Sequence, residues 1–240
     1  MHQVKRAIIL AAGKGERLRP VTINTPKPLV CVNGVKMIDS VIDALHKNGI
    51  DDIIIVTGYL ARCFDAVKAA HPEITLVNNP DYDSCNNISS LYCAREYLDT
   101  DVMILDGDQL IFNSEVLNPF FERSGYNAVE VCGPTDEWLL TVKNDIVVSC
   151  SVGGCNGWQL YSISRWMASD ALALKNNLEL EFEERRNRNI YWDDIPVFIH
   201  KDEFVLEIRK MNADDVIEID SINELMDIDS SYKDYCNSYS

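Results

Sequence analysis

The segment 8–30 contains the residues whose types and spacing point most directly to chemistry. An apolar run leads into Gly13-Lys14-Gly15, Arg17 follows four residues after the first glycine, and Lys27 lies between two prolines. Glycines let backbone N–H groups approach phosphate oxygens without a Cβ in the way. Arg17 adds a planar fork of donors, and Lys27 adds a compact positive charge. We therefore predict that this loop binds the triphosphate of a nucleotide, with three further residues at its entrance: Leu10, Ala11 and Ala12.

Two familiar glycine loops do not match this segment. The dinucleotide fingerprint requires a third glycine where this chain has Leu18, and no G-x-x-x-x-G-K-[ST] loop occurs in the sequence. The remaining alternative is an ordinary turn between a strand and a helix, with charges that face solvent. The clamp Pro26-Lys27-Pro28, together with Arg17, favours phosphate binding over that alternative.

The same segment resembles the signature of a known enzyme family. Its pattern L-A-A-G-x-G-x-R-L-x-P, followed by T-P-K-P-L-V, is similar to that of nucleotidyltransferases, which join a nucleoside triphosphate to a phosphorylated acceptor. The resemblance implies a transferase whose product is a nucleoside-diphosphate sugar or a CDP-alcohol. It leaves the acceptor open.

Acidic residues lie at the ends of two predicted strands. Asp106 and Asp108 flank a glycine after an apolar run, and Asp220 ends a second run at 216–219. One or two carboxylates are the usual protein ligands of a Mg²⁺ ion that bridges phosphates. In the resembled family, aspartates at such positions hold the catalytic metal, which makes Asp108 and Asp220 the expected Mg²⁺ ligands. An acidic turn is the alternative for the first pair, and an N-cap of the helix expected at 222–228 is the alternative for Asp220.

The first half of the chain alternates apolar strands with amphipathic helices. This order predicts right-handed β-α-β units and an α/β fold with a doubly wound, mostly parallel, Rossmann-like mixed sheet. Ligands of such sheets bind at the carboxyl ends of the strands. The glycine loop, Gly58 and the aspartates Asp106 and Asp108 all follow strands, so we expect them to converge at one edge. The expected strands are 4–12, 52–57, 74–77 and 102–105, and the expected helices are 37–48, 60–70 and 88–98.

Beyond about residue 124 the pattern changes to short apolar stretches that are typical of antiparallel strands. No Pro/Gly/Ser-rich linker divides the chain, so we predict a single nucleotidyltransferase domain, 1–240. Its nucleotide-binding part spans about 1–123, and its small antiparallel, acceptor-binding part spans about 124–230. The expected strands here are 128–132, 139–142, 146–150 and 157–163, followed by helices at 165–175 and 179–186 and a frayed end at 230–240.

A polar cluster opens the helix expected at 88–98. Asn86, Asn87 and Ser89 offer amide and hydroxyl groups that suit the edge of a pyrimidine base. Capping of the helix by one of the asparagines is the simpler alternative. The pattern N-N-x-x-S-L, however, resembles the cytidylyltransferase branch of the family, and this resemblance implies CTP rather than UTP.

Later segments resemble the bacterial CTP:phosphocholine cytidylyltransferases of lipopolysaccharide and teichoic-acid pathways. In that family, aromatic and acidic residues surround the choline cation, which ring faces and nearby negative charge attract. Burial in the core is the alternative for each tryptophan. The segments that carry the resemblance are Glu137–Leu140, Ile190–Asp194 and Glu218–Ser221. The acceptor-binding residues that it implies are Trp138, Trp158, Tyr191, Trp192 and Asp193.

One segment departs from that family's pattern. Gly157-Trp158-Gln159-Leu160-Tyr161 stands where the family has G-V-S-F-W. The larger side chain and the amide keep phosphoethanolamine, 2-aminoethylphosphonate and a phosphorylated amino-acid amide open as acceptors.

Composition limits the partners of the chain. Its formal net charge of −16 over 240 residues argues against nucleic-acid binding. No apolar run reaches membrane-spanning length and no signal peptide is evident, so we expect a cytoplasmic protein without membrane contact. Eight scattered cysteines favour free thiols, and four histidines without H-x-x-x-H spacing predict no zinc site. Both a monomer and a homodimer stay open.

The expected reaction transfers CMP from CTP to phosphocholine or a related amino-alcohol phosphate or phosphonate, with release of pyrophosphate. Arg17, Lys27 and Asp108 are the expected catalytic residues. Arg17 would neutralise the leaving pyrophosphate, and Lys27 would stabilise charge near the α-phosphorus. Two alternatives remain, a sugar-1-phosphate nucleotidyltransferase and an inactive subunit that senses nucleotides.

Overall fold

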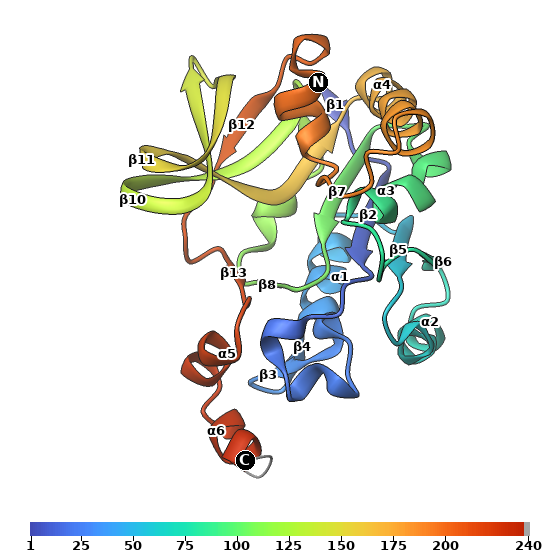
Figure 1. The fold of residues 1–240 in the computed structure, drawn as a ribbon, viewed down its shortest axis with the longest axis vertical. Helices are drawn as coiled ribbons and strands as arrows, with labels where there is room; N and C mark the ends of the chain where they lie inside the picture. Colours follow the sequence, from blue (N-terminus) through green and yellow to red (C-terminus); the bar gives the residue numbers. More distant parts are fainter. Residues whose placement is uncertain (238–240) are drawn as a thin grey trace.

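Parallel strands form the centre of a seven-stranded sheet in the computed structural model, which describes residues 1–237 (Figure 1). β2 pairs in parallel with β5 and β7, and β5 pairs in parallel with β6. Three more strands extend the sheet beyond β7, in the order β10-β12-β11-β7-β2-β5-β6. The bounds of the strands are β2 (Arg6–Ala11), β5 (Ile53–Thr57), β6 (Thr75–Asn78), β7 (Val102–Asp106), β10 (Gly125–Lys143), β11 (Ile146–Trp166) and β12 (Glu207–Lys210).

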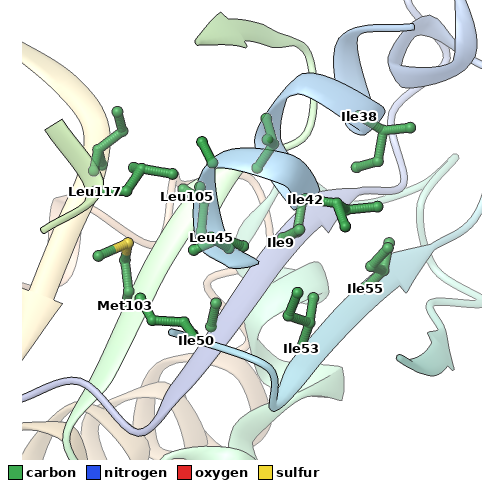
Figure 2. Close-up of a cluster of buried hydrophobic side chains, with 14 of the residues drawn as sticks. Ile9, Ile38, Ile42, Leu45, Ile50, Ile53, Ile55, Met103, Leu105 and Leu117 are labelled. Carbon is green, nitrogen blue, oxygen red and sulfur yellow. The ribbon is translucent and has the colours of Figure 1, made fainter. Parts of the chain in front are cut away.

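Helices cover both faces of this sheet, because successive strand residues point to opposite sides and both sides are apolar. α1 (Met37–Lys47) and α2 (Asp65–Ala70) cover one face, and α3 (Ile88–Cys93) and α4 (Ala168–Glu179) cover the other. Figure 2 shows the first face, where Ile38, Ile42 and Leu45 of α1 lie over Ile9 of β2. The doubly wound α/β fold is confirmed.

The predicted short strands of the second half merge into two long ones. β10 and β11 form an antiparallel hairpin, and repeated register shifts bend it away from the central sheet. The helix expected from Arg165 begins only at Ala168, since Arg165 and Trp166 still pair with β7. A π-helical turn, Leu180–Glu184, occupies most of the helix expected at 179–186. The sequence pattern did not predict β12.

Short ladders and helices complete the described chain. The frayed end expected at 230–240 is wrong for 231–237, which form α6, and 238–240 lie outside the described residues. No helix among the described residues combines the length and apolar character that crossing a membrane requires. The remaining strands and α-helices are β1 (His2–Gln3) with β9 (Phe120–Phe121), β3 (Cys31–Val32) with β4 (Val35–Lys36), β8 (Gln109–Ile111) with β13 (Val216–Glu218), α5 (Ile222–Ile228) and α6 (Ser231–Asn237).

The β8–β13 ladder and one small core cluster bring the C-terminal segment to the glycine loop. β13 pairs antiparallel with β8, so Glu218 lies opposite Gln109, next to Asp108. Leu18 of the loop and Ile219 belong to the same buried cluster. Together these contacts place Asp220 beside residues that are about two hundred positions earlier in the chain.

Candidate active site

The glycine loop lines a pocket of about 410 Å³ at the carboxyl ends of the parallel strands. Gly15 has a φ of +60°, and a Cβ at this position would lie 2.9 Å from the Cβ of Lys27. Since other residues rarely adopt this φ, the position requires glycine. The Thr22 hydroxyl fixes the loop by donating to the Gly15 carbonyl at 2.7 Å. The predicted residues that line this pocket are Leu10, Ala11, Gly13, Gly15, Arg17, Lys27, Asp106, Asp108, Tyr191 and Asp220.

Lys27 is buried beside this pocket between two carboxylates. Its Nζ lies 2.6 Å from Oδ2 of Asp108 and 2.8 Å from Oδ1 of Asp220. Nη2 of Arg17 lies 3.2 Å from the same Asp220 oxygen. Burial alone would lower the pKa of Lys27, but the two carboxylates outweigh it and hold the pKa above its usual value. The predicted catalytic and metal-binding residues thus form one charged cluster.

Ser221, not Asp220, caps α5. The Ser221 hydroxyl accepts from the Glu224 amide at 3.3 Å, and the Glu224 carboxylate accepts from the Ser221 amide at 2.9 Å. This capping box leaves the Asp220 carboxylate available to Lys27 and Arg17. The capping alternative for Asp220 is therefore wrong.

Two further carboxyl groups, those of Asp106 and Glu218, line the pockets beside this cluster. Burial, followed by the charge of Asp108, raises the pKa of Asp106 well above its usual range and that of Glu218 to about 7. A hydrogen bond of 2.7 Å from Nε2 of Gln109 partly offsets the effect at Glu218. Burial opposes ionisation of Asp220 as well, yet contacts with Lys27 and Arg17 lower its pKa.

Asp108 and Asp220 fit a hard divalent cation such as Mg²⁺. Both carboxylates converge on one ammonium group, which shows that the protein directs them at a common positive charge. Mg²⁺ prefers oxygen ligands, and it usually takes one or two carboxylates while phosphates and water complete its octahedron. Asp106 lines the same pocket and offers a further oxygen close to these two carboxylates.

A smaller pocket of about 170 Å³ lies between the glycine loop and the start of α3. Asn87 precedes α3 but makes no capping bond with its side chain, and its Oδ1 instead accepts from the Trp192 amide at 2.9 Å. Buried Asn79 donates to the hydroxyls of Ser89 and Ser90 at 2.9 and 3.1 Å. The predicted residues that line this pocket are Ala12, Gly13, Asn86, Asn87 and Ser89.

A third pocket, of about 300 Å³, opens directly from the first. The rings of Trp138 and Tyr191 meet edge to face there, with centroids 5.8 Å apart. Burial raises the pKa of Asp193 to about 7, although the Tyr126 hydroxyl donates to it at 3.0 Å. Asp194 instead fixes the turn by accepting from the Tyr191 amide at 2.8 Å. Residues shared with the first pocket are Arg17, Asp106, Asp108, Tyr191 and Asp220.

Two predicted tryptophans lie outside these pockets in the described part of the chain. Trp192 is 3% exposed and packs in the core against Tyr126 and Trp166. Trp158 lies on the β10–β11 hairpin, where Nζ of Lys210 is 5.1 Å from the centroid of its ring. Trp192 therefore follows the core alternative, whereas Trp158 is only partly buried, against a small separate cluster; neither lines the pocket where the acceptor was expected.

Gly58 supports the glycine loop and lines none of the three pockets. A Cβ on Gly58 would lie 2.8 Å from the Cβ of Tyr82 and 2.9 Å from the carbonyl oxygen of Ala12. The next amide, that of Tyr59, donates to the same carbonyl at 3.0 Å. Gly58 thus permits close packing of the end of β5 against the loop.

Several pocket residues were absent from the predicted site: Asn79, Tyr82, Glu137, Ser162 and Glu218. Asn79 directly follows β6, so the strand-end rule that found the aspartates also applies to it. Glu137 and Glu218 lie within the segments that carried the resemblance. Ser162 lies inside β11, and no sequence signal marks it.

The chain is similar to known nucleotidyltransferases in sequence and in structure. The family model of the MobA-like NTP transferase domain matches residues 7–181. A 2-aminoethylphosphonate cytidylyltransferase from Lancefieldella rimae is 35% identical, over 94% of this chain and 92% of that protein. A choline-phosphate cytidylyltransferase from Streptococcus pneumoniae is 33% identical, over 95% and 98%. The solved structure of CTP:phosphocholine cytidylyltransferase LicC from Streptococcus pneumoniae matches with a TM-score of 0.86 at 33% identity, over 96% of this chain and 99% of that one.

Proposed function

Because the chain belongs to the MobA-like NTP transferases, in the branch of the choline-phosphate and 2-aminoethylphosphonate cytidylyltransferases, we propose that it transfers CMP from CTP to a small phosphorylated or phosphonylated amine. This proposal rests on the residues that line both the first and the third pocket: Arg17, Asp106, Asp108, Tyr191 and Asp220. We call these residues the shared wall. One pocket is lined by the glycine loop and Lys27, and the other by Trp138 and acidic side chains. A phosphate held at this wall contacts the first pocket while its amine extends into the second.

The proposed reaction is an in-line displacement at the α-phosphorus of CTP. A phosphate or phosphonate oxygen of the acceptor is already anionic at neutral pH, so it attacks without a general base. Its bond to the α-phosphorus forms as the bond to the β-phosphate oxygen breaks, and pyrophosphate leaves. The protein contributes positioning and charge neutralisation. Buried Lys27 stabilises charge near the α-phosphorus, and the more exposed Arg17 neutralises pyrophosphate.

We propose Mg²⁺ as the metal of this reaction, held by Asp108 and Asp220. When bound, the ion would supply charge neutralisation to the phosphate oxygens. Lys27 contacts the same two carboxylates and orients them toward the shared wall. Arg17 restrains Asp220 from the side of the glycine loop.

The acceptor pocket suits a cation. Glu137 and Asp193 add carboxylates to those of the catalytic cluster, and Trp138 and Tyr191 provide aromatic rings. A quaternary ammonium favours ring faces beside negative charge, whereas a primary ammonium also donates hydrogen bonds to carboxylates. Phosphocholine and 2-aminoethylphosphonate are therefore the leading acceptors, and phosphoethanolamine and a phosphorylated amino-acid amide are further candidates. A sugar phosphate lacks the positive charge that this pocket favours.

The base is proposed to lie in the pocket before α3. The amides of Asn86 and Asn87 supply donors and acceptors for the edge of cytosine. Because cells make CTP internally, we place the reaction in the cytoplasm. Free thiols are found at Cys31, Cys63, Cys85, Cys93, Cys132, Cys150 and Cys155, in keeping with a reducing compartment.

A pyrophosphate-release panel tests this function. CTP and UTP are each combined with phosphocholine, 2-aminoethylphosphonate, phosphoethanolamine and hexose 1-phosphates, with Mg²⁺ present. Release with CTP and a phosphorylated or phosphonylated amine is the expected result. Preferential release with UTP and a hexose 1-phosphate would establish the sugar nucleotidyltransferase instead. Tight CTP binding without release from any acceptor would establish the nucleotide sensor.

A further inference from the structure

Two histidines and a glutamate that are separated in the sequence meet at the surface. His46 lies in the last turn of α1, and His71 and Glu73 lie in the connection between α2 and β6. Nε2 of His46 is 3.3 Å from Oε1 of Glu73, and Nδ1 of His71 is 3.4 Å from the same oxygen. One ligand atom from each residue lies within 4.8 Å of the other two. Three potential metal ligands therefore face one point.

The two distances from the Glu73 oxygen match the spacing of ligand atoms around a tetrahedral ion. With bonds of about 2.0–2.1 Å, neighbouring ligand atoms around tetrahedral zinc lie about 3.3–3.4 Å apart. The side chains of His46 and His71 are 29% and 27% exposed, so an ion has access from solvent. A water molecule would occupy the fourth position of a tetrahedral ion bound here.

The backbone holds the two ligands of the α2–β6 connection in place. The Ile74 amide donates to the His71 carbonyl at 3.1 Å, and the His71 amide donates to the Val67 carbonyl at 2.9 Å. Nζ of Lys68 donates to the Pro72 carbonyl at 2.6 Å. Ile74 is fully buried, which fixes the end of this turn in the core. Little rearrangement is then needed to bind an ion.

The cluster lies at the sheet edge opposite the catalytic carboxylates. His46 precedes the connection to β5, and Glu73 lies just before β6 begins at Thr75. Both connections therefore reach the amino ends of their strands. Asp106 and Asp108 lie at the carboxyl end of β7. A metal ion bound by the histidine cluster would therefore share no ligand with an ion bound by Asp108 and Asp220.

The geometry points to a metal site, distinct from the active site, in which His46, His71 and Glu73 bind a zinc-like divalent transition-metal ion. Two imidazoles and one carboxylate suit Zn²⁺, whereas Mg²⁺ prefers oxygen ligands. The ion would fasten the end of α1 to the turn before β6. This inference reverses the expectation of no zinc site, which rested on spacing along the sequence alone.

Calorimetry of the metal-free chain with Zn²⁺ tests the site. Excess Mg²⁺ is included to occupy sites made only of oxygen ligands. We expect one saturable Zn²⁺ site in the unsubstituted chain, and binding weakened at least ~100-fold in His46→Ala and His71→Ala, since even the loss of a residue that only supports a ligand costs 10–100-fold. His2→Ala is the matched control, because His2 pairs with Asp101 in another part of the surface.

A second measurement guards against misfolded variants. Glu73→Gln keeps the size of the side chain and removes its charge. The probe is Co²⁺, which binds in place of Zn²⁺ and whose visible absorption depends on its coordination geometry. We expect the intense absorption of tetrahedral Co²⁺ in the unsubstituted chain and in His2→Ala, and its loss in Glu73→Gln. Absence of saturable Zn²⁺ binding, or equal affinity in the substituted and unsubstituted chains, would leave only a hydrogen-bonded histidine–glutamate cluster and overturn the proposal.

Discussion

Replacing Lys27 with alanine removes the cation that contacts both Asp108 and Asp220. In the proposed reaction this ammonium stabilises charge that develops near the α-phosphorus. Loss of one preorganised donor of this kind typically costs about 2.7–4 kcal/mol of transition-state stabilisation. We therefore expect kcat to fall by about 100- to 1,000-fold. CTP affinity should fall less than about tenfold, because the glycine loop and Arg17 remain.

The same substitution should also lower the free energy of unfolding, by an amount that depends on how exposed Lys27 and its two carboxylate partners are. Removing one partner of a fully buried ion pair costs about 3–5 kcal/mol. The Lys27 side chain is only 10% exposed, but those of Asp108 and Asp220 are 30% and 40% exposed, so solvent screens the charges left behind. We expect a loss of about 1–2 kcal/mol in the free energy of unfolding.

The pH dependence of this loss has a definite sign. The folded pKa of Lys27 is raised, so its stabilisation is fully present below the unfolded pKa and disappears only as the pH rises through the raised value. Urea unfolding should therefore give a difference between the two proteins that does not shrink from about pH 6 to 9, because Lys27 stays charged over that range.

Pyrophosphate release gives kcat, and calorimetry gives the dissociation constant of CTP. Lys36→Ala is the matched control, since the Lys36 side chain is 41% exposed and pairs only loosely with Asp39 at 3.7 Å. It should retain both values within about twofold. An unchanged kcat in Lys27→Ala would remove Lys27 from the mechanism. A loss confined to CTP affinity would also refute the role given to it here.

Three further substitutions test separate parts of the site. Trp138→Ala should raise the KM for the amine acceptor by about 10- to 30-fold, which corresponds to the loss of one desolvated cation–π contact. Steady-state kinetics measures this change, and an equal effect in Trp158→Ala would contradict the assignment of Trp138 to the acceptor pocket. Gly15→Ala should lower kcat/KM more than ~10-fold and cost about 1–2 kcal/mol of stability, because the positive φ disfavours alanine and the added Cβ would press against Lys27. A fully active, equally stable variant would show that the loop tolerates a side chain. The folded pKa of Glu218, about 7, exceeds its unfolded value, so the unsubstituted chain loses stability as the pH rises from about 4.5 to 7. Glu218→Gln should lack this loss and be about 1–2 kcal/mol more stable at pH 8 but not at pH 4, as measured by calorimetric unfolding; parallel pH profiles would argue against a buried, uncharged Glu218.

The nucleotide-binding half was predictable because its signals are local. β2, β5 and β7 are continuous apolar runs, and the strand-end rule places the glycine loop and Asp106 at the same edge. For α1 and β5, the predicted and the observed boundaries agree within one or two residues. The resemblance added the family, which the comparisons confirm.

The remaining features depend on pairing between distant residues. Asp220 reaches Lys27 only because β13 pairs with β8. Trp192 is drawn into the core by packing that a short aromatic motif does not reveal. His46 and His71 meet because α1 and the turn before β6 end at the same edge, so motif spacing along the chain missed them.

A crystal structure with the CDP-linked product of the active acceptor tests the central claim most directly. The account predicts the two phosphates beside Gly13, Arg17 and Lys27, the base against Asn87, and the amine between Trp138 and Tyr191. A product bound in the reverse direction, with its base against Trp138 and its amine before α3, would contradict the account.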